Sequence, residues 1–346
     1  MNVFFFSIGA RDRASSRLRV WDHLDWAQQS GFAVRADSQV EAGVRRAACT
    51  VYFRMVRRLP KWASDFFWAD VIFVQESLLL WPLLYFKHIG KDRRVIFDFS
   101  DPVDHAGPGL KGRLRKAMFR KMTQNADAIM FENRTYESRL GELGKPLWHF
   151  YGPVDARRYG EARSELEKLE TAESSVKLLW TGSPGTFEFV RPLLPVIDQI
   201  AAERPLELIL IGVESAMFTF QHAQVTAYRW EEETEFSLVA KGTLGLFRLP
   251  EDDSALLRGA GKLFIYLAAG VIPVATNRGI SRDVMNDSGI GFPVDDAADW
   301  SDVLQKAIKL VANMQPASRS AQHYALEHLS YEAYRKQLAL LFTAVA

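Results

Sequence analysis

Short apolar runs alternate with helical stretches along this chain, and the whole series occurs twice. The first series starts with the run Val3–Ile8 and the second with Lys177–Trp180, and helical stretches fall between the later runs. Parallel strands need a long crossover connection, usually a helix, so this alternation is typical of a parallel sheet covered by helices on both faces. We therefore predict an α/β protein that contains two such sheets.

The other apolar runs have the length of single buried strands. They are Phe32–Val34, Ala69–Val74, Val95–Phe99, Ala128–Phe131, Leu206–Ile211, Thr226–Trp230, Leu244–Leu249 and Ile272–Ala275. Helical periodicity predicts helices at Arg17–Gly31, 40–60, Glu188–Ala202, Ala255–Ala269, Trp300–Val311 and Ser330–Ala344. The second of these is expected to end before Pro60, because proline cannot donate the helical hydrogen bond.

A polar segment separates the two series of runs. Residues 154–175 are rich in Glu, Arg and Ser and have no strong apolar period, so we interpret them as a linker. A chain of 346 residues is also too long for one compact α/β core. We expect one domain at 1–153 and a second at 154–329.

The charge is distributed unevenly between the two halves. Residues 1–150 carry a net charge of +8 and the remainder −7, so the halves are expected to meet different partners. The single cysteine, Cys49, excludes an internal disulfide and a cysteine-based zinc site. No run reaches the roughly 18 uncharged apolar residues of a membrane span, and Val3–Ile8 is short for a signal peptide. These features favour a cytoplasmic protein.

Glycine-containing loops follow the first strand of each half. They are Ser7–Ala10 and Thr181–Thr186, and neither matches the GxGxxG or the P-loop pattern, which disfavours a simple dehydrogenase. Ligands of open parallel sheets bind at the carboxyl ends of the strands, where helix N-termini attract anions. Each loop is therefore either a ligand-binding loop or a plain strand–helix turn.

The segment Gly245–Gly279 carries the most specific pattern in the chain. A strand leads to a proline with acidic residues, then to a lysine-containing helix and a glycine–proline turn. The residues concerned are Pro250, Glu251, Lys262, Tyr266, Ala268, Gly270, Pro273 and Val274. This segment resembles the donor-binding segment of retaining GT-B glycosyltransferases of the family 4 (group 1) type. Looser similarity extends from the helix after Arg13 to the closing helix at Ser330–Glu332.

The resemblance implies a GT-B fold, in which two Rossmann-like domains face a common cleft and the closing helix, 330–346, packs back on the first domain. It implies a hexosyltransferase-like enzyme that moves a sugar from a nucleotide sugar to a saccharide or lipid-linked saccharide acceptor with retention. Surface polysaccharide or glycolipid synthesis is the implied setting. The leaving diphosphate would take the acceptor's proton, so neither a metal nor another cofactor is expected.

Donor-binding residues are predicted from the chemistry of a nucleotide sugar. Lys262 and Arg258, four residues apart, would share one helix face and address the diphosphate. Backbone N–H groups at strand ends suit phosphate oxygens, and the residues concerned are Gly9, Gly182 and Ser183. The alternatives are solvated side chains and ordinary turns.

The sugar and the base need other groups. Glu251 and Asp253 offer carboxylates to sugar hydroxyl groups, and Tyr228 and Trp230 could line an apolar slot for the base. Tyr266 is included because it belongs to the matched motif. The alternatives are a helix cap for the acidic residues and core packing for the aromatic residues.

Acceptor-side groups are predicted after the strand Val95–Phe99. His105 could orient an acceptor hydroxyl, and Asp101 lies in the same run. We assign Asp101, His105 and Lys262 as catalytic. The alternative is that Asp101 and Asp104 only cap the next helix.

The sequence departs from the family pattern at its paired glutamates. The glutamate that precedes the tyrosine is Ile265 here, and its partner eight residues earlier is Leu257. Two alternatives therefore stay open: a degenerate GT-B protein that binds a nucleotide or glycan without transfer, and a GT-B-like epimerase or phosphorylase.

Two basic clusters, Arg45–Lys61 and Lys111–Lys121, lie in the first half close to aromatic or apolar residues. Such clusters suit peripheral binding to an anionic membrane surface. No nucleic-acid motif accompanies the charge, so a nucleic-acid partner is not expected. The alternative is a solvated basic face.

Overall fold

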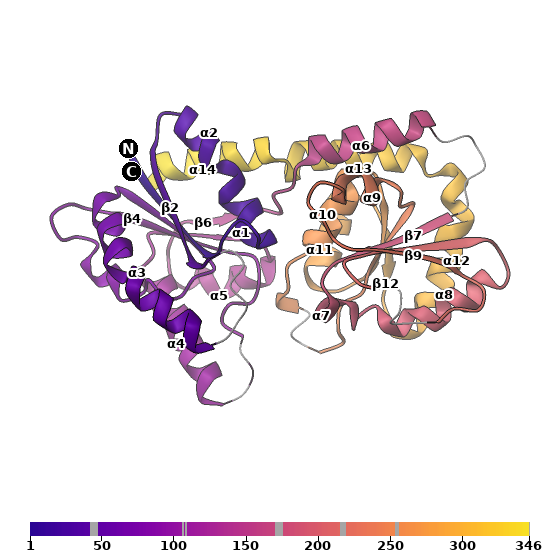
Figure 1. The fold of residues 1–346 in the computed structure, drawn as a ribbon, viewed down its shortest axis with the longest axis horizontal. Helices are drawn as coiled ribbons and strands as arrows, with labels where there is room; N and C mark the ends of the chain where they lie inside the picture. The colour runs from indigo at the N-terminus through magenta and orange to yellow at the C-terminus, as the bar shows by residue number, and fades with distance from the viewer. Residues whose placement is uncertain are drawn as a thin grey trace. The chain divides into compact units, whose positions relative to one another are not determined.

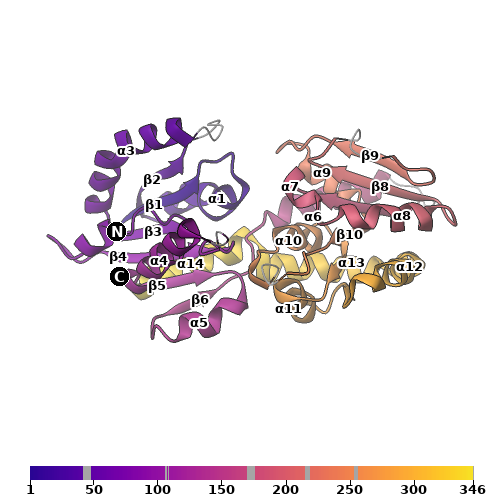
Figure 2. The same ribbon diagram turned by 90° about the horizontal axis from the view of Figure 1, so that it is seen from below.

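The computed structural model describes residues 1–41, 48–105, 107, 109–169, 176–214, 219–252 and 256–345, with the backbone alone at 48–55. The chain forms two compact units, each with a six-stranded parallel sheet flanked by helices (Figures 1 and 2). The first unit comprises Met1–Pro153, Leu257–Gly259 and Tyr334–Ala346, and the second Val154–Leu256 and Ala260–Ala333. Two Rossmann-like domains are thereby confirmed.

The first unit orders its strands β2-β1-β3-β4-β5-β6. The strands are β1 (Asn2–Gly9), β2 (Ala33–Val40), β3 (Val71–Gln75), β4 (Arg94–Phe99), β5 (Ala128–Phe131) and β6 (Leu147–His149). The helices are α1 (Ala14–Arg19), α2 (Leu24–Gln29), α3 (Ala48–Trp68), α4 (Leu110–Asn125), α5 (Glu137–Gly141) and α14 (Tyr331–Val345), with 3₁₀ turns at Trp21–His23, Leu83–Phe86 and Arg134–Tyr136. The strand order reverses between β1 and β3, and such switch points are where open α/β sheets bind ligands.

Strand β1 shows why this sheet needs helices on both faces. The Phe6 ring packs 4.9 Å from the ring of Trp62 in α3, whereas the Phe5 ring lies 6.0 Å from that of Phe342 in α14. All four side chains are fully buried. Because successive residues of a strand point to opposite faces, the continuous phenylalanine run fills the core on both sides.

The closing helix returns to the first unit, as the resemblance implied. Helix α14 buries Tyr334, Leu338, Leu341 and Phe342. Its tyrosine hydroxyl donates a hydrogen bond of 3.1 Å to the carbonyl oxygen of Arg19. The two chain ends consequently lie close together (Figures 1 and 2).

The second unit orders its strands β12-β11-β10-β7-β8-β9. They are β7 (Val176–Thr181), β8 (Leu206–Ile211), β9 (Gln224–Tyr228), β10 (Leu244–Phe247), β11 (Ile272–Thr276) and β12 (Phe292–Val294). The helices are α6 (Ala156–Leu169), α7 (Pro184–Phe187), α8 (Leu194–Ala201), α9 (Glu235–Ala240), α10 (Gly261–Ala268), α11 (Gly279–Ser288), α12 (Trp300–Leu310) and α13 (Gln315–Tyr324). Turns of 3₁₀ helix lie at Arg191–Leu193, Ala297–Asp299 and Val311–Asn313, and a π-helical turn lies at Ala325–Leu329. Here the order reverses between β7 and β10.

Two helices differ from the sequence-based expectation. The segment interpreted as a linker contains α6, which buries only Ala156 and Tyr159 and is held by Arg163, whose Nη1 donates to the carbonyl oxygens of Ala240 and Gly242. Helix α3 continues through Pro60 to Trp68. Burial of Trp62 and Phe66 in the core compensates for the hydrogen bond that proline removes.

Other boundaries also shift. The predicted helix Arg17–Gly31 is interrupted between Arg19 and Leu24, and the one predicted at Ala255–Ala269 begins at Gly261 in the described part of the chain. The helix predicted from Glu188 begins as α8 at Leu194. Strands β6 and β12 were not predicted, because each has only three residues.

Candidate functional site

Glycine turns follow neighbouring strands of the second unit. Gly182 and Ser183 follow β7, and Gly212 follows β8. Gly212 has a φ of +95°, and a Cβ atom there would lie 2.0 Å from the carbonyl oxygen of Gly182. Only glycine allows these two turns to pack so closely.

Lys262 lies against the turn after β7. Its Nζ is 3.4 Å from Oγ1 of Thr186 and 5.6 Å from the centre of the Trp180 ring. A Cβ atom on Gly182 would lie 2.6 Å from Cε of the lysine, so glycine leaves room for that side chain. The ammonium group therefore sits at the switch point between β7 and β10, beside the start of α10. Such a position suits an anionic ligand.

Two of the predicted phosphate-binding N–H groups already have partners. The N–H of Gly182 donates to the carbonyl oxygen of Ile211 at 2.9 Å, and the N–H of Gly9 donates to Oγ of Ser16 at 3.1 Å. The roles predicted for these two N–H groups are therefore wrong. Ser183 is exposed ahead of α7, and its predicted role stays open to test. Thr186, which the sequence analysis did not single out, supplies the hydroxyl group beside Lys262.

Arg258 and Tyr266 do not have the predicted arrangement. Arg258 precedes α10 and groups with the first unit, and its carbonyl oxygen accepts from Nδ2 of Asn133 at 3.0 Å. It therefore shares no helix face with Lys262. Tyr266 is fully buried and donates its hydroxyl to the carbonyl oxygen of Leu246, so it is a core residue that cannot contact a donor. The helix face predicted for Arg258 and the ligand contact predicted for Tyr266 are therefore wrong, whereas a contact of the Arg258 side chain with a diphosphate stays a prediction.

The first of the predicted acidic residues, Glu251, follows β10. Glu251 is exposed and accepts from Nη2 of Arg248 at 2.9 Å, while its own carbonyl oxygen accepts from Nη1 of Arg278 at 2.7 Å. The segment is thus fixed by two guanidinium groups that the sequence analysis did not include. Asp253 lies outside the described residues. Contacts to a sugar stay a prediction.

Of the predicted base-binding aromatic residues, Tyr228 ends β9, the neighbour of β8, and Trp230 follows this strand. The carbonyl oxygen of Tyr228 accepts from the N–H of Gly212 at 2.8 Å, and Nζ of Lys241 lies 5.3 Å from the centre of its ring. Trp230 is 36% exposed and therefore keeps surface on which a base could stack. Their role in binding a base stays a prediction.

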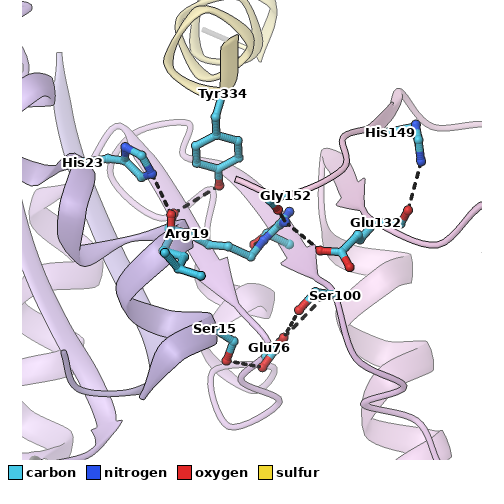
Figure 3. Close-up of polar contacts among 11 residues, drawn as sticks. Ser15, Arg19, His23, Glu76, Ser100, Glu132, His149, Gly152 and Tyr334 are labelled. Atoms are coloured by element: carbon cyan, nitrogen blue, oxygen red, sulfur yellow. Dashed lines mark hydrogen bonds and ion pairs between the residues drawn. The ribbon is translucent and has the colours of Figure 1, made fainter. Parts of the chain in front are cut away.

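A second polar cluster lies at the switch point of the first unit, at the carboxyl ends of its strands. Glu76 follows β3 and is buried, and its Oε1 accepts from Oγ of Ser100 at 2.6 Å. Its Oε2 accepts from Oγ of Ser15 in α1 at 3.3 Å (Figure 3). The same oxygen lies 3.9 Å from Nη2 of Arg13. The sequence analysis missed this cluster, because no motif marks residues so far apart in the chain.

The backbone of Glu76 is strained. Its φ of +54° makes it the one non-glycine residue with positive φ in the described ranges, 1–41, 48–105, 107, 109–169, 176–214, 219–252 and 256–345. Its N–H donates to the carbonyl oxygen of Asp98 at 2.8 Å, which holds this conformation. Such strain is typical of functional sites, although it does not itself identify one.

A buried ion pair supports the same edge of the sheet. Nε of Arg19 donates to Asp98 at 2.7 Å, its second terminal nitrogen also contacts that carboxylate, and Nη1 lies 3.5 Å from Glu132 (Figure 3). Burial alone would lower the pKa of Arg19, but the negative charge of Asp98, the hydrogen bond to Asp98 and the charge of Glu132 reverse this and raise it. Arg19 therefore stays charged and links α1 to β4 and to the residue after β5.

Asp101 and His105 lie in the loop after β4. Asp101 keeps exposed surface, yet loss of water around its carboxyl group raises its pKa, and the negative charge of Glu76 raises it further. A backbone hydrogen bond from Gly259 and the positive charges of Arg13 and Arg258 oppose this shift. His105 is exposed. Their catalytic roles stay predictions.

The helix-cap alternative fails for Asp104. This residue is buried and accepts from the Tyr136 hydroxyl at 2.8 Å and from Nη2 of Arg139 at 2.9 Å.

Across the described part of the chain, no group of three or more His, Cys, Asp or Glu side chains could hold a metal ion. No described helix is long and apolar enough to cross a bilayer.

Comparison with known proteins identifies the fold. No protein-family model matches the sequence, and no curated protein matches it in sequence. Among solved structures, sucrose-phosphate synthase from Thermosynechococcus elongatus is similar with a TM-score of 0.74 at 11% identity, covering 99% of this chain and 98% of that one. HepE from Anabaena, solved with UDP, gives 0.69 at 11% identity, covering 99% and 100%. Starch synthase IV from Arabidopsis thaliana, bound to ADP and acarbose, gives 0.67 at 12% identity and 99% of each chain. The fold is therefore that of GT-B glycosyltransferases over the whole chain.

Proposed function

We propose that this protein is a glycosyltransferase that moves a sugar from a nucleotide-sugar donor to a saccharide or lipid-linked saccharide acceptor. The observation that carries the proposal is Lys262, whose ammonium group lies at the switch point of the second unit beside Gly182 and Thr186. A cation there, next to the start of a helix, is chemically suited to a diphosphate. Similar folds solved with UDP and with ADP support a nucleotide as the ligand.

The reaction follows from the chemistry of the donor. The bond between the anomeric carbon and the diphosphate oxygen breaks, and the acceptor oxygen forms the new bond to that carbon. The departing diphosphate takes the proton of the acceptor hydroxyl. Lys262 would stabilise the negative charge that gathers on the diphosphate as the bond breaks. Retention of configuration is part of the proposal and matches the resemblance of Gly245–Gly279.

The second unit would bind the donor through the residues around its switch point. The hydroxyl group of Thr186 lies 3.4 Å from Nζ of Lys262 and 3.5 Å from the hydroxyl group of Ser183, so both hydroxyl groups would contact phosphate oxygens, and Glu251 would accept from sugar hydroxyl groups. Trp230 and Tyr228 would stack on the base. In the first unit, Asp101 and His105 would act on the acceptor. No cofactor is proposed, so activity should survive chelation by EDTA.

A second candidate is a GT-B protein that binds a nucleotide without transferring a sugar. The absence of the paired glutamates favours this second candidate. Leu257, at the first of the two positions, packs against the core of the first unit, and Ile265, at the second, lies in α10. Neither side chain can accept a hydrogen bond from a ribose. Donor binding without turnover would support this candidate.

Titration calorimetry with UDP, ADP, GDP and the matching nucleotide sugars tests both candidates. We expect one nucleoside diphosphate to bind and its sugar conjugate to be consumed when an acceptor is added. Product analysis by NMR would reveal retention, and inclusion of EDTA tests independence from metals. Lack of affinity for every nucleotide would contradict the proposal, and formation of an epimerised donor would identify an epimerase.

We also propose that the protein acts at a membrane, through helix α4. Arg113, Lys116 and Arg120 are exposed at helical spacing, and Leu110 and Leu114 beside them are 83% and 59% exposed. The other basic cluster is a weaker candidate in its described part, because Arg58 pairs with Asp37 and Lys61 pairs with Asp37 and Asp65. A lipid-linked acceptor in polysaccharide or glycolipid synthesis would fit this surface.

A further inference from the structure

We propose that Glu76 is a positioning residue that makes the acceptor site of the first unit select neutral sugar hydroxyl groups over phosphorylated ones. The inference rests on the proposed transferase function and names the chemical class of its acceptor. It starts from the contacts of the buried carboxylate with two serine hydroxyl groups, which come from different elements: Ser15 from α1 and Ser100 from the end of β4.

Glu76 fixes the direction in which the hydroxyl groups of Ser15 and Ser100 donate their hydrogen bonds. A carboxylate only accepts hydrogen bonds, so each serine must direct its hydroxyl proton to Glu76. The separations are 2.6 Å for Ser100 and 3.3 Å for Ser15. Each serine oxygen then has lone pairs but no proton for a ligand. A ligand that meets these oxygens must itself donate, as a sugar hydroxyl does and an ionised phosphate does not.

The arrangement is held rigidly. Glu76 is 1% exposed, its backbone is fixed by the hydrogen bond to Asp98, and the N–H of Ser100 also points to Oε1 at 3.4 Å. Ser15 is only half-buried, whereas Ser100 is 9% exposed. The buried glutamate therefore acts on a ligand chiefly through Ser15, and Ser100 helps to hold the carboxylate that directs the Ser15 proton.

Net charge alone does not decide this selectivity. Arg13 lies 3.9 Å from Glu76 and donates from Nε to Oγ of Ser15 at 3.4 Å. Its guanidinium offsets the carboxylate, as Arg258 does for Asp101. The discrimination therefore comes from the direction of the serine protons, which a side-chain amide in place of the carboxylate would disturb.

The test is the variant Glu76→Gln, which keeps the shape of the side chain but adds two N–H donors. One serine would then turn its proton outward. Binding of methyl glucoside and of glucose 6-phosphate to the full chain is followed by saturation-transfer NMR, and turnover is measured with the donor identified by calorimetry. We expect the preference for the neutral probe to fall about tenfold, which corresponds to about 1.4 kcal/mol. The acceptor KM should rise while nucleotide affinity stays unchanged.

Two further variants make the result decisive. Ser100→Ala should weaken binding of the neutral probe without reversing the preference, and Glu142→Gln, at an exposed glutamate of the same unit, should change neither. An unchanged preference in folded Glu76→Gln, or a wild type that binds neither probe or favours the phosphate, would overturn the inference. Absence of nucleotide binding would instead overturn the proposed function, so the two failures are distinguishable.

Discussion

Single residues in this protein act through neighbours that lie far away in the sequence. Lys262 lies beside Thr186 and Trp180, and Glu76 joins Ser15 to Ser100. In both cases, short distances between groups from separate elements create a site at a strand end. Substitution of one such group should change one function and spare the fold.

Replacement of Lys262 by alanine tests the donor site. A hydrogen bond to a charged group is worth about 1.5–3 kcal/mol, so Lys262→Ala should weaken nucleoside diphosphate binding by about ten- to a hundredfold. Transfer should fall further, because charge on the diphosphate grows in the transition state. Calorimetry and kinetics measure the two effects. Lys309→Ala, an exposed residue of α12, serves as the control, and a folded Lys262→Ala protein with wild-type affinity would refute the assignment.

His23 should make stability depend on pH. Its ring is fully buried, 2.7 Å from the carbonyl oxygen of Leu18 and 3.2 Å from Nε of Arg335. Burial, together with the charges of Arg335 and Arg19, lowers the pKa of His23 from 6.5 to about 3, although the contact with Leu18 opposes the shift. Below pH 6.5 the unfolded chain therefore binds a proton that the folded chain does not.

Stability should consequently fall as the pH falls from 6.5 towards 3, by up to about 1.4 kcal/mol per pH unit from this residue. Urea unfolding across this range measures the slope. In His23→Gln the slope should be smaller, whereas His88→Gln, at an exposed histidine, should keep it. Equal slopes in His23→Gln and wild type would show that the buried ring takes up its proton without penalty.

Elements are stabilised by packing from distant parts of the chain. Helix α3 passes through a proline because Trp62 and Phe66 are buried, and α14 packs in the compact unit that begins with strand β1. The rings of Phe5, Phe32 and Phe73 all lie within 6.4 Å of Phe342. The last helix is therefore part of the first unit's core.

Truncation of Phe342 should test that conclusion. Phe342→Ala is expected to lower the free energy of unfolding by about 3–5 kcal/mol, because it removes a fully buried ring and leaves a cavity. Leu340→Ala, at a residue of the same helix that is 50% exposed, should change it by less than about 0.5 kcal/mol. Denaturant titration measures both, and similar losses would argue against a core role for α14.

At the scale of the whole molecule, the charge is concentrated where a membrane contact is proposed. Residues 1–150 carry +8, and α4 presents exposed basic and apolar side chains together. Each basic residue near an anionic surface contributes about 1 kcal/mol, so a few suffice for reversible binding. Arg115 is excluded from this set, because its Nε donates to the carbonyl oxygen of Val103 at 2.6 Å.

Co-sedimentation with liposomes tests the proposed contact. The wild type should bind anionic vesicles, more weakly as salt rises, and should ignore neutral ones. Reversal of Arg113, Lys116 and Arg120 to Glu should release it while nucleotide affinity is unchanged. Reversal of Lys306, Lys309 and Arg319, exposed residues of the second unit, is the matched control. A wild type that does not bind anionic vesicles at low salt would favour a soluble acceptor.

The architecture could be predicted from the sequence because its signals are local. A strand buried on both faces needs an uninterrupted apolar run, as at Phe4–Phe6. The alternation of strands and helices, the two domains and the position of Lys262 after β10 all follow from residues near one another in the chain.

Contacts between distant residues could not be predicted in the same way. Helix α6 lacks a strong apolar period and depends on hydrogen bonds from Arg163, and Tyr266 matched a motif but is enclosed by the core. The Glu76 cluster joins a residue of α1 to residues that follow β3 and β4, and no spacing in the sequence indicates it. Apolar periodicity and turn chemistry are properties of neighbouring residues, so the sequence alone determined the elements. Burial, ion pairing and hydrogen-bond direction depend on which elements meet, and only the tertiary structure decided them.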